Sequence, residues 1–376
     1  MNVLFTRFPL ESRFGGAEVQ TLALMKGLRK RGHEVTFLGS CPVLLEETTK
    51  LKIENGELVL SAVEGLNIGP PPVTKWHAMS FAWRGCFMKK KLHVQCSMFH
   101  EQFDAVVMLS LSEKLLLTPY FHARGTRVIW VEHDRVGHWL THNPWLRRLK
   151  KLSRMATTVV VSDLSKGIYD HLGFAHVIAI TNGVDASRMG NHNEQTSKRA
   201  NEQTFHIGTL ARLSYDKGVD VLIDAVKDLS DVSLTIIGTG KDELAVQTAA
   251  LALPRGCVLP KTENLREFYE GLELFVLPSR EHDPFGLVAA EAMALGIPTI
   301  VTDACGIAGY LTHDRDAMIV AAGSVDALRS AIVELKKDNE KRSLMGAIGK
   351  WTAEEKFSIE RMVDCYEKQL RTKMEN

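Results

Sequence analysis

The sequence lacks the features that mark secreted and membrane-spanning chains. It has no run of the roughly 18 apolar residues that a spanning helix needs. Its start shows no basic stretch followed by a long apolar segment, as a signal peptide does. The six cysteines are scattered without a C-x-x-C pair, which argues against a zinc site or a disulfide framework and favours a reducing compartment. We therefore expect a soluble, cytoplasmic protein.

Three further patterns are missing. The chain has no repeat of solenoid period, no low-complexity tract and no G-x-G-x-x-G fingerprint, and the last of these absences argues against an NAD enzyme. No recognised nucleic-acid motif appears, and basic residues in one half are offset by acidic residues in the other. We therefore expect no nucleic acid among the partners.

The composition is that of a globular protein of about two domains. The 376 residues are 45% hydrophobic and 24% charged. Residues 1–185 hold 23 Lys and Arg against 16 Asp and Glu, whereas residues 186–376 hold 23 against 29. A basic first half and an acidic second half indicate two domains with different partners.

Short apolar runs alternate with helical patterns along both halves, which predicts the α/β class with parallel sheets. In the first half the clearest strands are residues 2–6, 33–39, 104–109, 127–132, 157–162 and 176–181, with a region of weak pattern at about 41–100. The second half repeats the alternation from residue 205 onward. We predict a Rossmann-like domain at 1–187, a polar linker at 188–204, a second Rossmann-like domain at 205–355 and a C-terminal helix at 356–376 that packs back toward the first domain.

Two short stretches contain candidate phosphate ligands. Gly15 and Gly16 lie between a strand and a helix, where a glycine turn brings backbone N–H groups close to an anion, although an ordinary tight turn explains them equally well. Arg212 and Lys217 follow the first strand of the second domain, at the edge where open α/β sheets bind ligands. They suit a diphosphate, and two solvated surface cations are the alternative.

The stretch DPFGLVAAEAMALG, residues 283–296, places an acid inside an apolar helix. Pro284 and Gly286 mark the junction between loop and helix, where unpaired N–H groups of the helix start can receive phosphate oxygens. Glu291 lies about one turn further on, where a carboxylate is costly without a partner. A ribose diol would be a suitable partner; the alternative is a solvent-facing stripe that happens to contain Glu291.

These stretches together carry a resemblance. ARLSYDKGVDVLIDA followed by LFVLPSREHDPFGLVAAEAMALGIPTIVTD is similar to retaining GT-B glycosyltransferases of family 4, and GGAEVQTLALMKGLRKRGHEVTFL resembles their N-terminal loop and first helix. The similarity spans nearly the whole chain, with a gap around residues 41–100. It implies two Rossmann-like, doubly wound domains facing a deep interdomain cleft, with a nucleotide-sugar donor held by the second domain and the acceptor by the first.

The resemblance also implies roles for single residues. Arg212 and Lys217 match the basic pair on the donor diphosphate, which does the work of a metal, so no metal and no other cofactor is expected. Glu291 matches the acid that binds the ribose, and His133 matches a histidine near the reacting centre. The remaining matches are to donor contacts: Gly15 and Gly16, and the backbone of Phe285, Gly286, Leu287 and Val288. The implied reaction is hexosyl transfer with retention to a hydroxyl acceptor, with the leaving phosphate taking the acceptor proton.

Two departures from the family pattern concern the donor sugar. Asp283 stands where relatives place a glutamate that reaches the sugar hydroxyls, and Glu281 is a competing candidate. The later Gly-Gly turn and glutamate are replaced by ACGIAGYL, in which Cys305 is expected to be a packed residue rather than a nucleophile. These changes leave two alternatives open: a noncatalytic subunit that binds nucleotide sugars, and another GT-B activity such as a nucleotide-sugar epimerase.

The basic residues of the first half indicate the class of acceptor. Residues 144–155 interleave Trp145, Leu146, Leu149 and Leu152 with five cations, which is typical both of a helix lying on an anionic membrane and of an ordinary helix with a charged outer face. We expect a glycan, lipid-linked or small-molecule acceptor, with peripheral contact at the inner face of the membrane and a place in cell-envelope polysaccharide or glycolipid synthesis.

Overall fold

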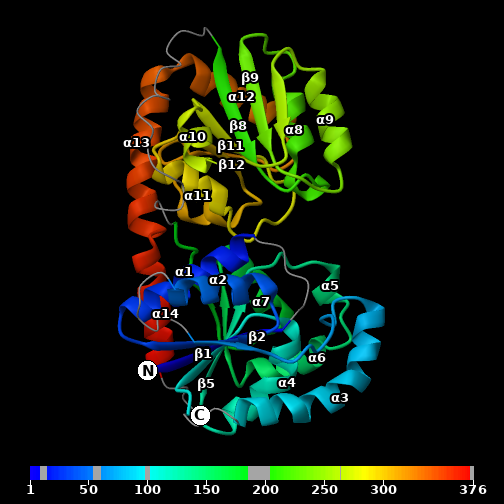
Figure 1. Ribbon diagram of the computed structural model, residues 1–376. Coiled ribbons are helices and arrows are strands. Elements are labelled where there is room, and N and C mark those ends of the chain that lie inside the picture. Colours follow the sequence, from blue (N-terminus) through cyan, green and yellow to red (C-terminus); the bar gives the residue numbers. More distant parts are fainter. Residues whose placement is uncertain (9–14, 54–60, 98–101, 185–203, 263, 373–376) are drawn as a thin grey trace. The chain divides into compact units, whose positions relative to one another are not determined.

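The computed structural model describes residues 1–8, 15–53, 61–97, 102–184, 204–262 and 264–372 (Figure 1). The chain divides into two compact units. The first unit comprises Met1–Gly183 together with Ile359–Asn376, and the second comprises Val184–Ser358. Nearly all of the predicted linker at 188–204 lies outside the described residues.

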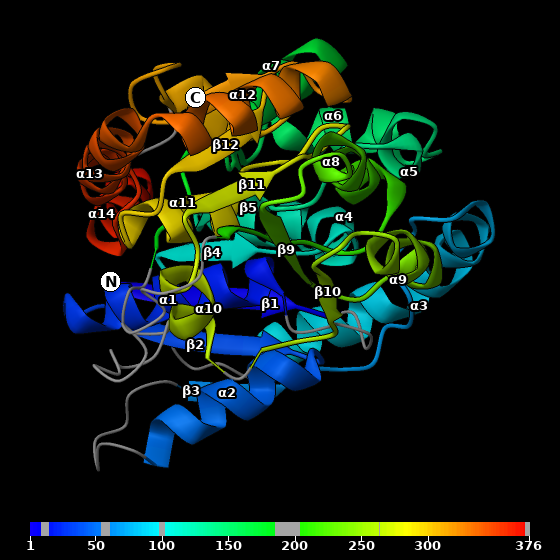
Figure 2. The same ribbon diagram turned by 90° about the horizontal axis from the view of Figure 1, so that it is seen from above.

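The first unit is built on a seven-stranded parallel sheet in the order β3-β2-β1-β4-β5-β6-β7, and Figure 2 shows β2, β1, β4 and β5 following one another in that order. β1 pairs with both β2 and β4, so the chain adds strands first on one side of β1 and then on the other. The carboxyl end of β1 is therefore the topological switch point, where such sheets bind ligands. The strands are β1 (Asn2–Arg7), β2 (Glu34–Gly39), β3 (Ser61–Glu64), β4 (Ala105–Met108), β5 (Arg127–Glu132), β6 (Thr157–Val160) and β7 (Val177–Ala179).

Helices cover both faces of this sheet, which is why its strands are apolar throughout. Along β4, Val106 and Met108 join one core cluster while Ala105 and Val107 join the other. The helices are α1 (Gly16–Lys30), α2 (Pro42–Ile53), α3 (Lys75–Ser97), α4 (Leu111–His122), α5 (His138–Thr141), α6 (Leu146–Ser153), α7 (Asp163–Leu172) and α14 (Ile359–Arg371).

The second unit is built on a six-stranded parallel sheet in the order β10-β9-β8-β11-β12-β13, with its switch point at β8. Its strands are β8 (Phe205–Leu210), β9 (Val232–Ile237), β10 (Gly256–Leu259), β11 (Leu274–Leu277), β12 (Thr299–Thr302) and β13 (Met318–Val320). Its helices are α8 (Val219–Val226), α9 (Glu243–Leu251), α10 (Leu265–Glu270), α11 (Leu287–Ala294), α12 (Val325–Lys337) and α13 (Asn339–Lys356), with short 3-10 turns η2 (Tyr215–Lys217) and η3 (Gly306–Tyr310). The predicted α/β class with two doubly wound parallel sheets is confirmed.

α14 packs on the first unit, although it follows the second unit in sequence. α14 buries Met362, Val363, Tyr366 and Leu370 in the same core cluster as α1. The two helices come close because α1 carries Gly27 at the crossing: a Cβ there would lie 2.3 Å from Val363 Cγ2. The chain therefore enters the second unit after Gly183 and returns to the first unit at Ile359.

Of the helices within the described ranges, none combines the length and apolar content that a membrane crossing requires.

Candidate functional site

In the second unit, an ion pair joins the loops that follow two neighbouring strands. Lys217 comes from η2 after β8, and Asp283 lies in the loop after β11. Lys217 Nζ lies 2.7 Å from Asp283 Oδ2, both side chains are largely buried, and the Ser279 hydroxyl donates to the same oxygen over 3.1 Å. Because β8 and β11 flank the switch point, the pair lies at the edge of the sheet where ligands bind in such folds.

The loop that carries Asp283 is held as a short extended segment. Asp283 N donates to Ala304 O, and Gly306 N donates back to Asp283 O, each over 2.9 Å. Two residues later, Ile307 N donates to Phe285 O over 2.7 Å. The Phe285 ring is buried against Phe357, so its side chain anchors the loop and only its backbone is placed to meet a ligand.

α11 begins directly after this loop. Gly286 adopts φ 95°, a left-handed conformation that favours glycine, and a Cβ there would lie 2.8 Å from Leu277 Cδ2. Leu287 and Val288 form the first turn, whose N–H groups have no acceptor inside a helix. This helix start therefore presents backbone donors and a positive dipole end next to the Lys217–Asp283 pair, an arrangement that suits an anion.

Glu291 lies one turn into α11 and is oriented by a tyrosine from another helix. The Tyr269 hydroxyl, on α10, lies 3.0 Å from Glu291 Oε2 and 3.1 Å from Val288 O. Tyr269 is fully buried, and burial together with the Glu291 charge raises the pKa of Tyr269 well above its usual value, so it stays a proton donor. The carboxylate is thereby fixed near the helix start rather than left on a solvent-facing stripe.

Arg212 lies in the same loop as Lys217 but is not part of the ion pair. Its side chain is 63% exposed and lies 3.6 Å from Asp216, whose other carboxylate oxygen accepts from Ser214. A guanidinium held this loosely can turn toward an incoming ligand at little cost.

In the first unit, the glycine turn is tied to the end of β1. Gly15 caps α1 in an extended conformation and Gly16 is its first residue. Glu18 accepts from Gly15 N over 3.1 Å and from Arg7 Nη2 over 2.6 Å. Because Glu18 is almost fully buried, this pair fixes the backbone of the turn at the carboxyl end of β1.

His133 follows β5 immediately, at the same edge of the first sheet. Burial, and then the positive charges of Arg7 and Lys114, lower the pKa of His133 to about 3, so its ring is neutral near neutral pH. Lys114 itself is buried, and it pairs with Glu132 over 2.9 Å and donates to Val131 O. A neutral imidazole beside buried cations is suited to hydrogen bonding.

Cys305 is buried in the second unit, as expected of a packed residue. Burial, followed by the nearby charge of Asp283, raises the pKa of the Cys305 thiol to about 11. The thiol is therefore protonated near neutral pH and is a poor nucleophile.

Comparison with known proteins identifies the family. The model for glycosyl transferases group 1 matches residues 191–351, and the model for glycosyltransferase family 4 matches residues 14–188, so the two together span most of the chain. The chain belongs to the family 4 glycosyltransferases. Its fold is GT-B: Anabaena HepE in complex with UDP superposes with a TM-score of 0.76 at 18% identity over 98% of this chain and 99% of that one.

Two curated relatives of this glycosyltransferase are named for the biosynthesis of lipopolysaccharide core and capsular polysaccharide. The lipopolysaccharide core biosynthesis glycosyltransferase LpsD of Rhizobium meliloti (strain 1021) is 26% identical over 65% of this chain and 69% of its own length. The capsular polysaccharide biosynthesis glycosyltransferase CapM of Staphylococcus aureus is 26% identical over 53% of this chain and 54% of its own length. The match thus covers about half to two thirds of these relatives.

The sequence located most of the candidate residues of this glycosyltransferase but missed those that position them. Within the second unit, the structure brings Lys217, Asp283, Gly286 and the first turn of α11 together. Tyr269 and Ser279 were not predicted, and neither were Glu18 and Lys114 in the first unit. Tyr269 and Lys114 contact residues on other elements or far along the chain, which no local pattern reveals. Ser279 lies four residues from Asp283 and Glu18 three residues from Gly15, the latter at the spacing of a capping box, so these two had a local signal.

Proposed function

We propose that this chain transfers a hexose-type sugar from a nucleoside diphosphate sugar to a hydroxyl acceptor, with retention and without a metal. The observation that carries the proposal is the Lys217–Asp283 pair at the start of α11, with Glu291 held by Tyr269 one turn further on. This arrangement offers a cation and backbone donors for a diphosphate, and a fixed carboxylate for two ribose hydroxyls.

In the proposed reaction, positive charge in the second unit stabilises the departing nucleoside diphosphate. Lys217, the exposed Arg212 and the first-turn N–H groups of α11 supply that charge, which is the task that a metal ion performs in other enzymes. The bond between the anomeric carbon and the phosphate oxygen breaks, and the acceptor oxygen attacks the same face of the sugar. The acceptor proton passes to the leaving phosphate.

Asp283 and His133 are proposed to contact the donor sugar. Asp283 is one methylene shorter than the glutamate of relatives, and its carboxylate is held by Lys217 and Ser279, which leaves the second oxygen to accept from a sugar hydroxyl. His133 contributes a neutral ring, consistent with its low pKa. Gly15 and Gly16 are proposed to offer backbone N–H groups to the same ligand.

The acceptor is proposed to be a glycan or a lipid-linked intermediate of a cell-envelope polysaccharide, bound by the first unit. The excess of basic residues in residues 1–185 supports an anionic or membrane-associated acceptor. The names of LpsD and CapM, which refer to lipopolysaccharide core and capsule, support the same class of product.

Thermal-shift screening against UDP, GDP, ADP and TDP tests the donor site, since a ligand of the folded state raises the melting temperature. We expect one nucleotide to give a shift that Glu291→Gln reduces and that Glu355→Gln, an exposed acid on α13, leaves unchanged. If no nucleotide shifts the wild-type protein, or if both variants behave alike, the proposed donor site is wrong.

Turnover separates an enzyme from a noncatalytic binding subunit. With the matching nucleotide sugar we expect slow donor hydrolysis that persists in EDTA, and Lys217→Ala should lower it about 10²–10³-fold, the scale for loss of one group that stabilises developing charge. Lys227→Ala, at an exposed lysine of the same unit, is the control. Binding without turnover across many acceptors would favour the noncatalytic alternative, and inversion at the anomeric carbon, seen by NMR, would contradict retention.

A further inference from the structure

α3 presents large apolar side chains to solvent along its outer face. Trp76, Met79, Trp83, Phe87 and Val94 are exposed, with Trp76 at 80% and Trp83 at 76%. Their spacing of three, four, four and seven residues places them in one stripe. Both views show α3 at the outer margin of the first unit (Figures 1 and 2). A contiguous apolar face of this kind on a globular protein marks an interaction surface.

The opposite face of α3 packs against the core of the first unit. Phe81, Leu92 and Cys96 are buried in the core cluster that α3 shares with α4. Trp83 and Phe87 stack edge to face on the outside, with ring centroids 5.8 Å apart. The exposed stripe is therefore additional to what the fold needs, and its two large rings hold each other in place.

The charge around the stripe has one sign. Residues 65–100 contain no Asp or Glu, and Lys89, Lys90 and Lys91 follow one another on α3. Within the described part of the chain no carboxylate pairs with these three lysines, whereas Lys336 and Lys341 elsewhere are paired with acids. The surface thus combines exposed aromatic rings with uncompensated positive charge.

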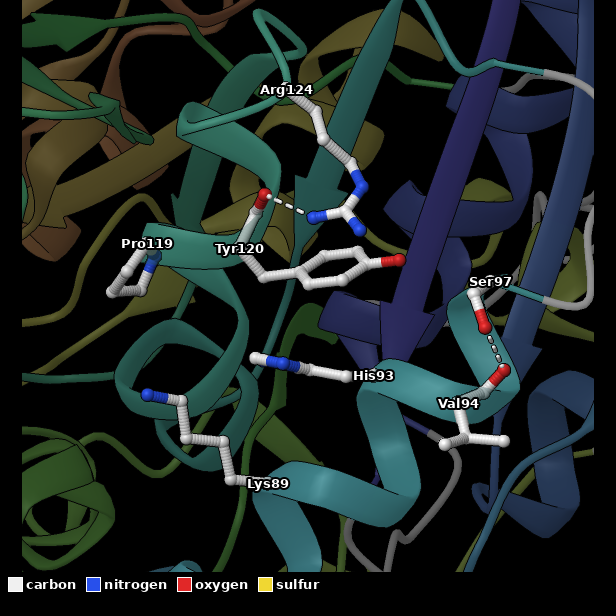
Figure 3. A pocket seen from close by; sticks show the side chains of 7 residues that line it. All are labelled: Lys89, His93, Val94, Ser97, Pro119, Tyr120 and Arg124. Atoms are coloured by element: carbon white, nitrogen blue, oxygen red, sulfur yellow. Dashed lines mark hydrogen bonds between the residues drawn. The ribbon is translucent and has the colours of Figure 1, made fainter.

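A hollow of about 440 Å³ lies between the end of α3 and the end of α4 (Figure 3). Lys89, His93, Tyr120 and Arg124 contribute to its lining, and none of its described lining residues is acidic. The Arg124 guanidinium lies 3.6 Å from the Tyr120 ring centroid, and the His93 ring packs against Tyr120 at 4.3 Å. A hollow with these cations suits a phosphate group.

We propose that α3 is a docking surface for an anionic phospholipid bilayer. The stripe enters the boundary between headgroups and acyl chains, where tryptophan is favoured, the lysines contact the headgroups, and the hollow takes a headgroup phosphate. A protein partner is less well matched, because residues 65–100 contain no acidic side chain and the exposed lysines next to the stripe complement a continuous negative surface.

This location differs from the one that the sequence indicated. On α6, Leu149 and Leu152 are buried in the core, and the Trp145 indole before it donates to Ala78 O on α3. The apolar ridge of residues 144–155 therefore packs against the core, with Trp145 and Leu146 partly buried, and the exposed residues of α6 are cations. The alternative of an ordinary helix with a charged outer face is the correct one for α6.

Co-sedimentation with vesicles tests the proposal. We expect binding to vesicles of phosphatidylcholine mixed with phosphatidylglycerol, and much weaker binding to phosphatidylcholine alone. The double variant Trp83→Glu with Phe87→Glu should lower the partition coefficient by more than about tenfold. The triple variant Lys89→Gln, Lys90→Gln and Lys91→Gln should lower it by a similar factor on anionic vesicles and make it insensitive to salt.

A matched control is available on α13, where Leu344 and Trp351 are also exposed. Leu344→Glu with Trp351→Glu adds the same charge and should leave vesicle binding unchanged. Absence of wild-type binding to anionic vesicles, or an equal loss in the control, would overturn the proposal. So would lipid-free self-association, measured by light scattering, that the α3 double variant abolishes, since the stripe would then bind a second copy of the chain.

The test is independent of the donor chemistry. All substituted side chains on α3 are at least partly exposed, so the variants are expected to melt close to the wild type, and the shift produced by a nucleoside diphosphate should be preserved. If the protein did not bind vesicles, the proposed donor site would still stand. If no nucleotide raised the melting temperature, the proposed membrane surface would still stand.

Discussion

At the scale of single residues, Tyr269 positions Glu291 rather than binding a ligand itself. Tyr269→Phe removes a hydroxyl that donates from α10 to Glu291 and to the Val288 carbonyl on α11, but keeps the buried ring. Loss of one such hydrogen bond costs about 1 kcal/mol, so nucleotide affinity should fall roughly fivefold. Calorimetric titration with the matching nucleotide measures it. Tyr366→Phe, at a buried tyrosine of the first unit, is the control and should change nothing in this titration.

Glu113 makes the stability of the first unit depend on pH. Burial raises the pKa of Glu113 to about 7, from an ordinary 4.5, although its carboxylate accepts from Ser110 N. Because the folded protein holds this proton more tightly than the unfolded chain, the resulting stability is complete below pH 4.5 and is lost as pH rises through about 7.

Glu113→Gln removes that titration. The decrease in the free energy of unfolding between pH 5 and pH 8, measured in urea, should be smaller in the variant by more than about 1 kcal/mol, since each pKa unit corresponds to about 1.4 kcal/mol. The opposite contribution of His133, whose pKa is lowered, cancels in the comparison because it is present in both proteins. Parallel pH profiles would show that Glu113 titrates normally.

At the scale of elements, the start of α11 depends on the left-handed Gly286. Gly286→Ala places a Cβ against Leu277 in a conformation that costs an L-residue about 1–2 kcal/mol. We expect the free energy of unfolding of the second unit to fall by that amount. We also expect the nucleotide-dependent thermal shift to disappear. Gly309→Ala in η3 is the matched control, because a Cβ there meets nothing within 4 Å. Equal effects would mean that this turn has no special geometry.

Most strands of the two sheets were predictable because buried parallel strands are largely apolar, whereas β3 and β13 were not predicted. Residues 127–132 were predicted as a strand and form β5 over the same bounds. Residues 41–100 gave a weak pattern, and the structure places α2, β3 and α3 there. α3 was missed because it is apolar on its exposed face as well as on its buried face, so it lacks the one-sided periodicity by which helices are recognised.

The residues of the candidate site also fall into those that the sequence indicated and those that it did not. Lys217, Gly286 and Glu291 belong to contiguous motifs and were located from sequence. Tyr269 lies 22 residues from Glu291 along the chain and touches it only after α10 and α11 have packed on the sheet. Such contacts form only through tertiary packing, and they cannot be predicted from the local pattern of a single sequence.

At the scale of the whole molecule, α14 contributes to a core cluster whose other buried members lie between Val3 and Ile180. Val363→Asp buries a carboxylate against α1 and should destabilise the first unit by roughly 3–5 kcal/mol. Hydrogen exchange should then show lost protection in β1, β4 and β5, with β8 and β11 unaffected. Lys368→Asp places the same side chain on the exposed face of α14 and should change neither unit. Equal loss of protection in both units would mean that they do not unfold separately.

The return of the chain at Ile359 also dictates an order of events during synthesis. The ribosome finishes Val184–Ser358 before it makes α14, so the second unit has its complete sequence while the first still lacks a helix from its core. Until α14 has been made, the apolar face that later receives Met362, Val363 and Leu370 stays uncovered. A ribosome stalled just after Ser358 would therefore hold a nascent chain whose second unit is finished and whose first unit is open to chaperones and proteases.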